Sequence, residues 1–126
     1  MASVIAQIFY LTVDSEQVNE YGWECDVGRN YLAARNGDVS RGVYEKAARI
    51  VFPRFLDTFN YIQAAERIWT ELQNVWDKWS TREVDNVECF TDFPRSMDVG
   101  DYIVFTNMPD KKFVVASKGF QVIDNT

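Results

Sequence analysis

The hydrophobic pattern begins with an almost unbroken apolar run near the start of the chain. Residues 4–13 read VIAQIFYLTV, a β-branched and aromatic composition that is typical of a strand. Both alternating sets of positions are apolar, and a strand in the middle of a sheet shows this pattern when both faces are covered. The pattern therefore predicts a central strand over residues 4–13.

Short helices with polar capping residues are predicted to follow this strand. Asp14 or Ser15 can cap a helix that ends at Tyr21, and Trp23 is expected to pack back onto the sheet. Asp26 can cap a second helix over residues 27–35. The Asn-Gly pair at positions 36 and 37 is typical of a helix end.

A third helix is predicted over residues 39–51, with Asp38 as its cap. The apolar positions of this stretch recur at helical spacing, and the Phe-Pro pair at positions 52 and 53 should end the helix. Residues 55–63 are compatible with either a strand or a helix. Here the composition favours a short strand over residues 56–62.

The clearest periodicity in the chain lies between residues 65 and 79. Apolar residues form one stripe and polar residues fill the other side, as in an amphipathic helix packed on a core. Trp69, Leu72 and Trp76 lie at the centre of the stripe, and we expect their side chains to be buried. The alternative is that the tryptophans form a surface for a partner.

The C-terminal third has the alternation and turn residues of a β-meander. An edge strand is predicted over residues 87–91, and three further strands over residues 102–106, 113–116 and 120–123. Without a repeat or linker in the sequence, we expect one α+β domain over residues 1–126. It should contain a mixed, mostly antiparallel sheet, a C-terminal meander and three to four packed helices.

Composition narrows the classes of function. The 126 residues carry 19 acidic and 13 basic side chains, a net charge of −6, and 15% are aromatic. A net negative charge disfavours nucleic-acid binding, which draws most of its affinity from phosphate contacts. The negative charge can serve solubility alone, or it can form an acidic surface that competes for a basic site on a partner.

The residue types needed for common catalytic and metal sites are scarce. The chain has no histidine, no glycine-rich phosphate loop and two distant cysteines, Cys25 and Cys89, each beside acidic residues. We therefore expect no catalytic residue, no metal and no cofactor, and we predict that the protein is not an enzyme. Residues 1–13 lack the features of a secretion signal, and no apolar run reaches membrane-spanning length. A cytoplasmic protein with reduced, mostly buried thiols is expected.

The stretch from residue 94 to residue 123 reads PRSMDVGDYIVFTNMPDKKFVVASKGFQVI. It resembles a C-terminal element of small, mostly uncharacterised proteins of phages, including cyanophages, and of plasmids. The helix before it fits loosely through Leu72, Gln73, Asn74 and Trp79, whereas the loop over residues 107–112 is longer than the usual tight turn. The matching positions are Arg95, Ser96, Val99, Gly100, Asp101, Val115, Gly119, Phe120 and Ile123.

The resemblance and the missing catalytic groups together lead to one functional expectation. We expect a phage-encoded, non-enzymatic protein, present in the cytoplasm of the infected cell, that binds and modulates a host macromolecule, most simply a host protein. Three alternatives stay open. They are a nucleic-acid-associated accessory protein, a small histidine-free enzyme that uses carboxylates, and a structural component of the virion.

The candidate binding residues lie in two loops, because loops on a rigid scaffold commonly carry function. The first is the acidic connector with Glu83, Asp85 and Glu88, which could face a basic host site and make binding salt-sensitive. The second is the tip of residues 107–112, where Met108 would project beside Lys111 and Lys112. The alternative is that both loops are merely solvated.

Overall fold

A computed structural model of the chain describes residues 4–52, 60–73, 87–91 and 95–124. These residues form an α+β fold in which every strand pairing is antiparallel. The order of strands across the sheet is β3-β2-β1-β4-β5-β6. The strands are β1 (Val4–Thr12), β2 (Val43–Phe52), β3 (Val87–Cys89), β4 (Tyr102–Phe105), β5 (Lys111–Val115) and β6 (Phe120–Asp124).

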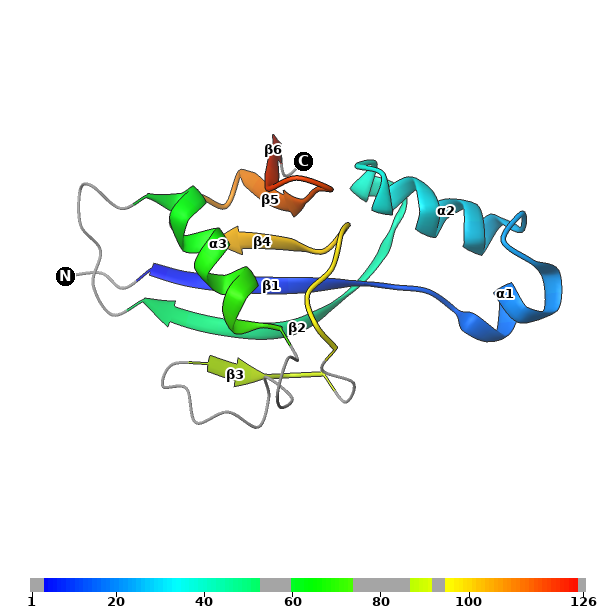
Figure 1. Cartoon of the computed structure of the whole chain (residues 1–126), viewed down its shortest axis with the longest axis horizontal. Helices are drawn as coiled ribbons and strands as arrows, with labels where there is room; N and C mark the ends of the chain where they lie inside the picture. The colour runs from blue at the N-terminus through cyan, green and yellow to red at the C-terminus, as the bar shows by residue number, and fades with distance from the viewer. Residues whose placement is uncertain (1–3, 53–59, 74–86, 92–94, 125–126) are drawn as a thin grey trace.

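The helices fall into two groups (Figure 1). Helices α1 (Ser15–Tyr21) and α2 (Asp26–Arg35), with the 3-10 turn η1 (Val39–Arg41), lie beyond one end of the sheet, between β1 and β2 in sequence. Helix α3 (Tyr61–Glu71) instead crosses one face of the sheet. The molecule therefore has a two-layer body and a helical extension.

The main core lies between α3 and the sheet. Ile68 and Leu72, each 1% exposed, pack with Ile8, Ile103 and Phe105, all of which are fully buried. Strand β1 supplies its even-numbered positions to this layer, because successive side chains of a strand point to opposite faces. The helix is held on the sheet by this apolar stripe, which contributes roughly 1.5–3 kcal/mol for each large side chain buried.

The first predicted strand is confirmed in both extent and position, since β1 lies between β2 and β4. Of its odd-numbered positions, however, Ile5, Gln7 and Phe9 are only half-buried, and Leu11 near the end of the strand is buried. On that face Val39 of η1 packs against Tyr102 and Val114. The cover predicted on both faces of this strand is therefore complete on the α3 side and partial on the other.

The helix predicted over residues 39–51 is also wrong, because this stretch forms η1 and the long strand β2. The register between β1 and β2 shifts between Ile8 and Phe9, so Ala47 is an extra residue in a β-bulge. Ala47 and Ala48 are both fully buried as a result. The bulge breaks the two-residue alternation and produces apolar spacings that look helical.

Helix α3 confirms the helix predicted from the periodicity of residues 65–79 over the part of that stretch that the structure describes. Tyr61 and Ile62 are helical, so the preference for a strand over residues 56–62 is wrong at its described end. Leu72 is buried as expected, whereas Trp69 is only half-buried. Trp76 lies outside the described residues.

The remaining elements agree with the sequence patterns in most respects. Asp14 caps α1 by accepting hydrogen bonds from the backbone N–H groups of residues 16 and 17, and β4, β5 and β6 form the predicted meander at one side of the sheet. The cap of α2 is Cys25 rather than Asp26. Trp23 does not pack on the sheet but is 48% exposed.

Candidate functional site

The loop from Arg95 to Asp101 carries the motif of the phage-like resemblance, and it is tied to the end of β1. Asp101 is fully buried, and its Oδ1 accepts the backbone N–H of Leu11 at 2.8 Å. The guanidinium of Arg95 binds both carboxylate oxygens, at 2.7 Å and 2.8 Å, and also donates to the Leu11 carbonyl. The backbone N–H of Asp98 fills the remaining position on Oδ2.

The polar contacts of this buried pair are with each other and with the backbone. Burial raises the pKa of the Asp101 carboxyl, and the hydrogen bonds and charge of Arg95 and the backbone N–H groups of Asp98 and Leu11 oppose that rise. All four contacts of the carboxylate come from N–H donors, and this geometry favours the ionised form because the carboxylate acts as an acceptor only. Partial burial alone would lower the pKa of the Arg95 guanidinium, but the hydrogen bond and charge of Asp101 outweigh it and raise that pKa. These contacts explain the pair by structure, since they join the end of β1 to the loop before β4.

The backbone conformation at position 100 explains the glycine of the Val-Gly-Asp motif. Its φ of 93° lies in a region that side chains rarely adopt, and a Cβ there would lie 3.0 Å from the Cα of Arg35. Its carbonyl accepts the hydroxyl of Tyr44 at 2.8 Å. The glycine at position 100 is thus explained by the close approach of this loop to α2.

A group of negative charges with no basic residue among them lies elsewhere, in the segment of residues 14–26 that we call the acidic arm. The arm contains five carboxylates and no lysine or arginine, and all five side chains are exposed. Two of the five have structural partners, because Asp14 caps α1 and Asp26 pairs with Arg29. The other three are Glu16, Glu20 and Glu24.

The arginines close to the acidic arm are already engaged. Arg35 pairs with Asp98 at 3.0 Å, and Arg41 donates to the side chain of Asn30. Among the described residues, none of the ion pairs involves Glu16, Glu20 or Glu24. Three carboxylates of the arm therefore remain without a cationic partner in the part of the chain that the structure describes.

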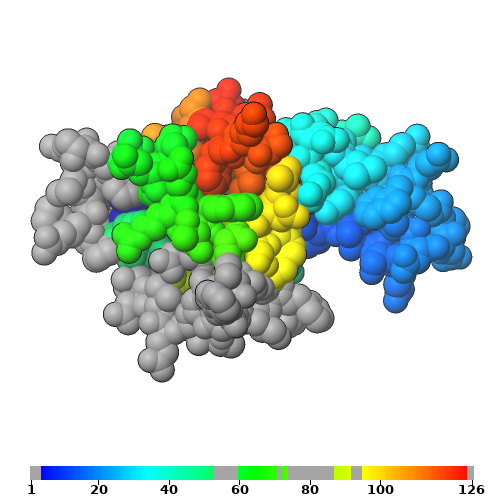
Figure 2. Space-filling model, in the orientation of Figure 1, coloured from blue at the N-terminus to red at the C-terminus, as the bar shows by residue number. Residues whose placement is uncertain are grey.

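The acidic arm also exposes large aromatic side chains. Tyr21 is 64% exposed and Trp23 is 48% exposed, and the Trp23 ring packs on Tyr31 in a tilted arrangement with the ring centroids 5.6 Å apart. Figure 2 shows the arm in blue at one end of the molecule, away from the body of the sheet. Exposed aromatic residues beside unpaired charge are typical of surfaces that bind other proteins.

The turn of the acidic arm is fixed by its packing on α2. A Cβ atom at Gly28 would lie 2.5 Å from the carbonyl oxygen of Trp23, so only glycine permits the turn to approach the helix this closely. The Sγ of Cys25 accepts the N–H of Gly28 and begins α2. Trp23 and Glu24 are therefore held in place at the surface.

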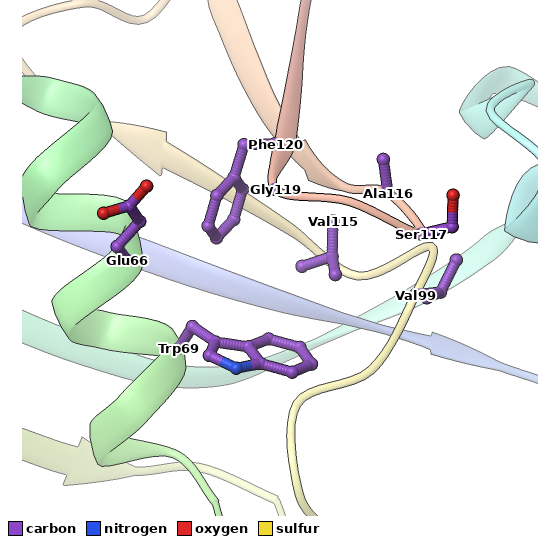
Figure 3. Close-up of a pocket in the computed structure, with 8 residues that line it drawn as sticks. All are labelled: Glu66, Trp69, Val99, Val115, Ala116, Ser117, Gly119 and Phe120. Atoms are coloured by element: carbon purple, nitrogen blue, oxygen red, sulfur yellow. The ribbon is translucent and has the colours of Figure 1, made fainter.

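A pocket of about 460 Å³ lies between α3 and the turn that joins β5 to β6 (Figure 3). Its walls are mostly apolar, with the rings of Trp69 and Phe120 on opposite sides of the space and Val115 between them. Among the described residues that line it, Glu66 is the only charged one. This volume is within the range of about 300–1,000 Å³ that is usual for ligand pockets.

The described members of the two candidate loops lie on different strands of the sheet, β3 and β5, or in the turn before β5. Glu83 and Asp85 lie outside the described residues, and Glu88 lies on the edge strand β3 with its carboxylate 3.8 Å from Arg49. At the other loop, Met108 packs against the core instead of projecting. Lys111 pairs with Asp124, and Lys112 lies over the Tyr102 ring at 4.8 Å.

The sheet face opposite α3 carries aromatic and basic side chains of the types that bind single-stranded nucleic acid. Phe9 and Tyr44 pack on the Tyr102 ring with centroids 4.9 Å and 4.7 Å away, and Lys112 covers it further. Tyr102 is consequently buried and has no open face on which a base could stack. These contacts favour a structural role for the cluster.

Other classes of site find little support in the described residues. They contain no group of three or more Cys, Asp and Glu side chains that could hold a metal ion, and none of their helices is long and apolar enough to span a membrane. Cys25 is half-buried and Cys89 is exposed, so the expectation of buried thiols is wrong, although neither forms a disulfide. No known protein family, curated protein or solved structure matches the chain.

Sequence reasoning missed the acidic arm, although the signal was present. Residues 1–28 contain no lysine or arginine at all, and a running count of charge along the chain would have marked this segment. The sequence pattern indicates helix caps at Asp14 and Asp26, and the net charge was weighed only for the chain as a whole. The exposure of Tyr21 and Trp23 could not be inferred, because Trp side chains are highly buried on average and Tyr side chains are intermediate.

Proposed function

We propose that this protein is a non-enzymatic binding protein that attaches to a basic site on a partner protein through the acidic arm. The observation that carries the proposal is the pairing of exposed Tyr21 and Trp23 with the unpartnered carboxylates of Glu16, Glu20 and Glu24. Aromatic residues supply contact area at a small entropic cost, and the charge accelerates encounter with a basic surface.

The resemblance of residues 94–123 adds a biological setting to this proposal. In that setting the protein is made from a phage genome in the cytoplasm of a bacterial host, where it binds and modulates a host protein. The net charge of −6 agrees with this choice of partner, because five of the excess negative charges lie in the acidic arm. An acidic protein of this kind would compete with nucleic acid for a basic site.

Affinity capture from lysate of a candidate bacterial host tests the proposal. The wild-type protein is compared with a variant in which Glu16, Glu20 and Glu24 are all changed to Gln. We expect recovery of the captured protein to fall at least about tenfold, and its dependence on salt to weaken, because screening acts on exposed charges.

A charge-matched control separates the arm from the rest of the surface. The control variant carries Glu45→Gln, Glu88→Gln and Asp110→Asn, which remove three exposed charges on β2, β3 and the turn before β5. We expect this variant to capture the partner as the wild type does. Loss of capture in the control, with capture retained in the arm variant, would contradict the proposal and favour the loops.

A further inference from the structure

The pocket between α3 and the β5–β6 turn has a composition that selects for a cation. Glu66 and Trp69 lie three residues apart on α3 and so share one side of the helix. Phe120, at the start of β6, closes the opposite wall, and Val99 and Val115 complete the apolar lining (Figure 3). The site thus combines two aromatic rings with a single carboxylate.

The charge of Glu66 has no counterpart inside the described structure. None of the ion pairs among the described residues uses its carboxylate. The hydroxyl of Thr70 donates to the backbone carbonyl of Glu66, not to its side chain. Aromatic faces are electrostatically negative and attract cations. Both features therefore favour a positively charged occupant.

The shape of the pocket favours a cation with an apolar stem. An arginine side chain buries its methylene groups against apolar walls while its guanidinium stacks on an aromatic ring and forms paired hydrogen bonds with a carboxylate. We propose that this pocket binds an arginine side chain of the partner protein, with Trp69 and Phe120 around the guanidinium and Glu66 as its counter-ion. This step rests on the proposed function, in which the partner presents a basic site.

The test uses two small probes that have nearly the same shape and differ in charge, one cationic and one neutral. Acetyl-arginine amide carries the guanidinium, and acetyl-citrulline amide replaces it with a neutral urea. Each probe is titrated into the isotopically labelled full-length protein, and binding is followed by the NMR signals of the Trp69 indole N–H and the backbone N–H groups of residues 117–120. We expect saturable shifts with the arginine probe and at least about fivefold weaker binding of the citrulline probe.

Variants assign the preference to particular side chains. Glu66→Gln should reduce the preference for arginine over citrulline to about twofold or less, because only the cation–π attraction remains. Glu88→Gln, which removes an exposed carboxylate on β3, serves as the matched control and should leave the preference unchanged. Since Glu66 is exposed, its substitution should not affect folding, and the test does not depend on altering the partly buried Trp69.

Three results would overturn the assignment of an arginine pocket. They are equal binding of both probes, an unchanged preference in Glu66→Gln, and an absence of shifts at the pocket up to the solubility limit. Failure here can be distinguished from failure of the acidic arm. Capture from lysate that depends on Glu16, Glu20 and Glu24 would still stand if the probes do not bind, and probe binding would stand if capture does not depend on the arm.

Discussion

The Arg95–Asp101 loop and the acidic arm use the same residue types in opposite ways. In the loop, one carboxylate is fully buried and accepts four N–H donors, two of them from a single guanidinium. In the arm, three carboxylates are exposed, and the described residues offer them no cation. In the loop, the paired charges join β1 to the meander. In the arm, the three carboxylates remain available to a partner.

The same contrast holds for the aromatic residues of the two regions. Tyr10 in the body is buried, its ring lies 4.3 Å from the Arg95 guanidinium carbon, and its hydroxyl donates to the Arg95 carbonyl. Tyr21 in the arm is 64% exposed. A charge or ring that is engaged within the fold is explained by stability, and one that is held at the surface without a partner needs another explanation.

Breaking the buried pair should give the largest effect on stability. Arg95→Leu removes the guanidinium and leaves the Asp101 carboxylate buried, with only the two backbone donors of Leu11 and Asp98. We expect the free energy of unfolding to fall by about 3–5 kcal/mol, since an uncompensated buried charge is costly. Urea denaturation followed by tryptophan fluorescence measures the change.

A matched substitution controls for the loss of an arginine. Arg35→Leu breaks the pair with Asp98, whose two side chains are 37% and 52% exposed. Such a pair contributes about 0.2–1 kcal/mol, so this variant should unfold close to the wild-type midpoint. If the two variants lose the same stability, the distinction between a buried pair and surface pairs is wrong.

The second prediction concerns Tyr44, which joins β2 to the loop by donating its hydroxyl to the Gly100 carbonyl. Burial raises the pKa of the Tyr44 phenol above its ordinary value of 10.0, and nearby Tyr102 and Asp101 raise it further. The folded state therefore holds this proton where the unfolded chain releases it. Stability from this group is complete below pH 10 and is lost as the pH rises above it.

Tyr44→Phe tests this linkage. At pH 7 the variant should lose about 1 kcal/mol, which is the usual net value of one hydrogen bond. Above pH 10 the wild type should lose stability more steeply than the variant, because the variant has one fewer phenol to ionise on unfolding. Urea midpoints at several pH values measure both slopes, and parallel slopes would show that Tyr44 does not contribute.

Much of the fold could be predicted from sequence where local signals and tertiary contacts agree. Asp14 caps a helix in the sequence and in the structure, and the three strands of the meander follow turns that their residues favour. Strand β2 was not predicted because its bulge at Ala47 disrupts the two-residue alternation. In addition, nine of its residues pair with residues of β1, and a local sequence pattern does not reveal such pairing. Long-range pairing overrode the helical propensity of its alanines.

The candidate sites were less predictable for a related reason. Whether a carboxylate is satisfied depends on residues that are distant in sequence, as Leu11 is from Asp101. The sequence placed Asp101 in a recognisable motif but did not show its burial. The pocket likewise joins Trp69 of α3 to Phe120 of β6, and only the packing of α3 across the sheet brings them together.

The smallest predicted effect gives the sharpest test of the comparison. Glu16 and Glu20 lie four residues apart on α1, where like charges repel, and Glu20 lies near the C-terminal end of the helix, where a negative charge is unfavourable. Glu20→Gln should therefore raise the free energy of unfolding by about 0.2–0.5 kcal/mol at low salt, and by less at high salt. Paired urea titrations of wild type and variant at both salt concentrations resolve this difference. A charge that lowers stability and is still placed beside exposed Tyr21 serves the surface rather than the fold, and a loss of stability in Glu20→Gln would instead class the arm with the Arg95–Asp101 loop as structure.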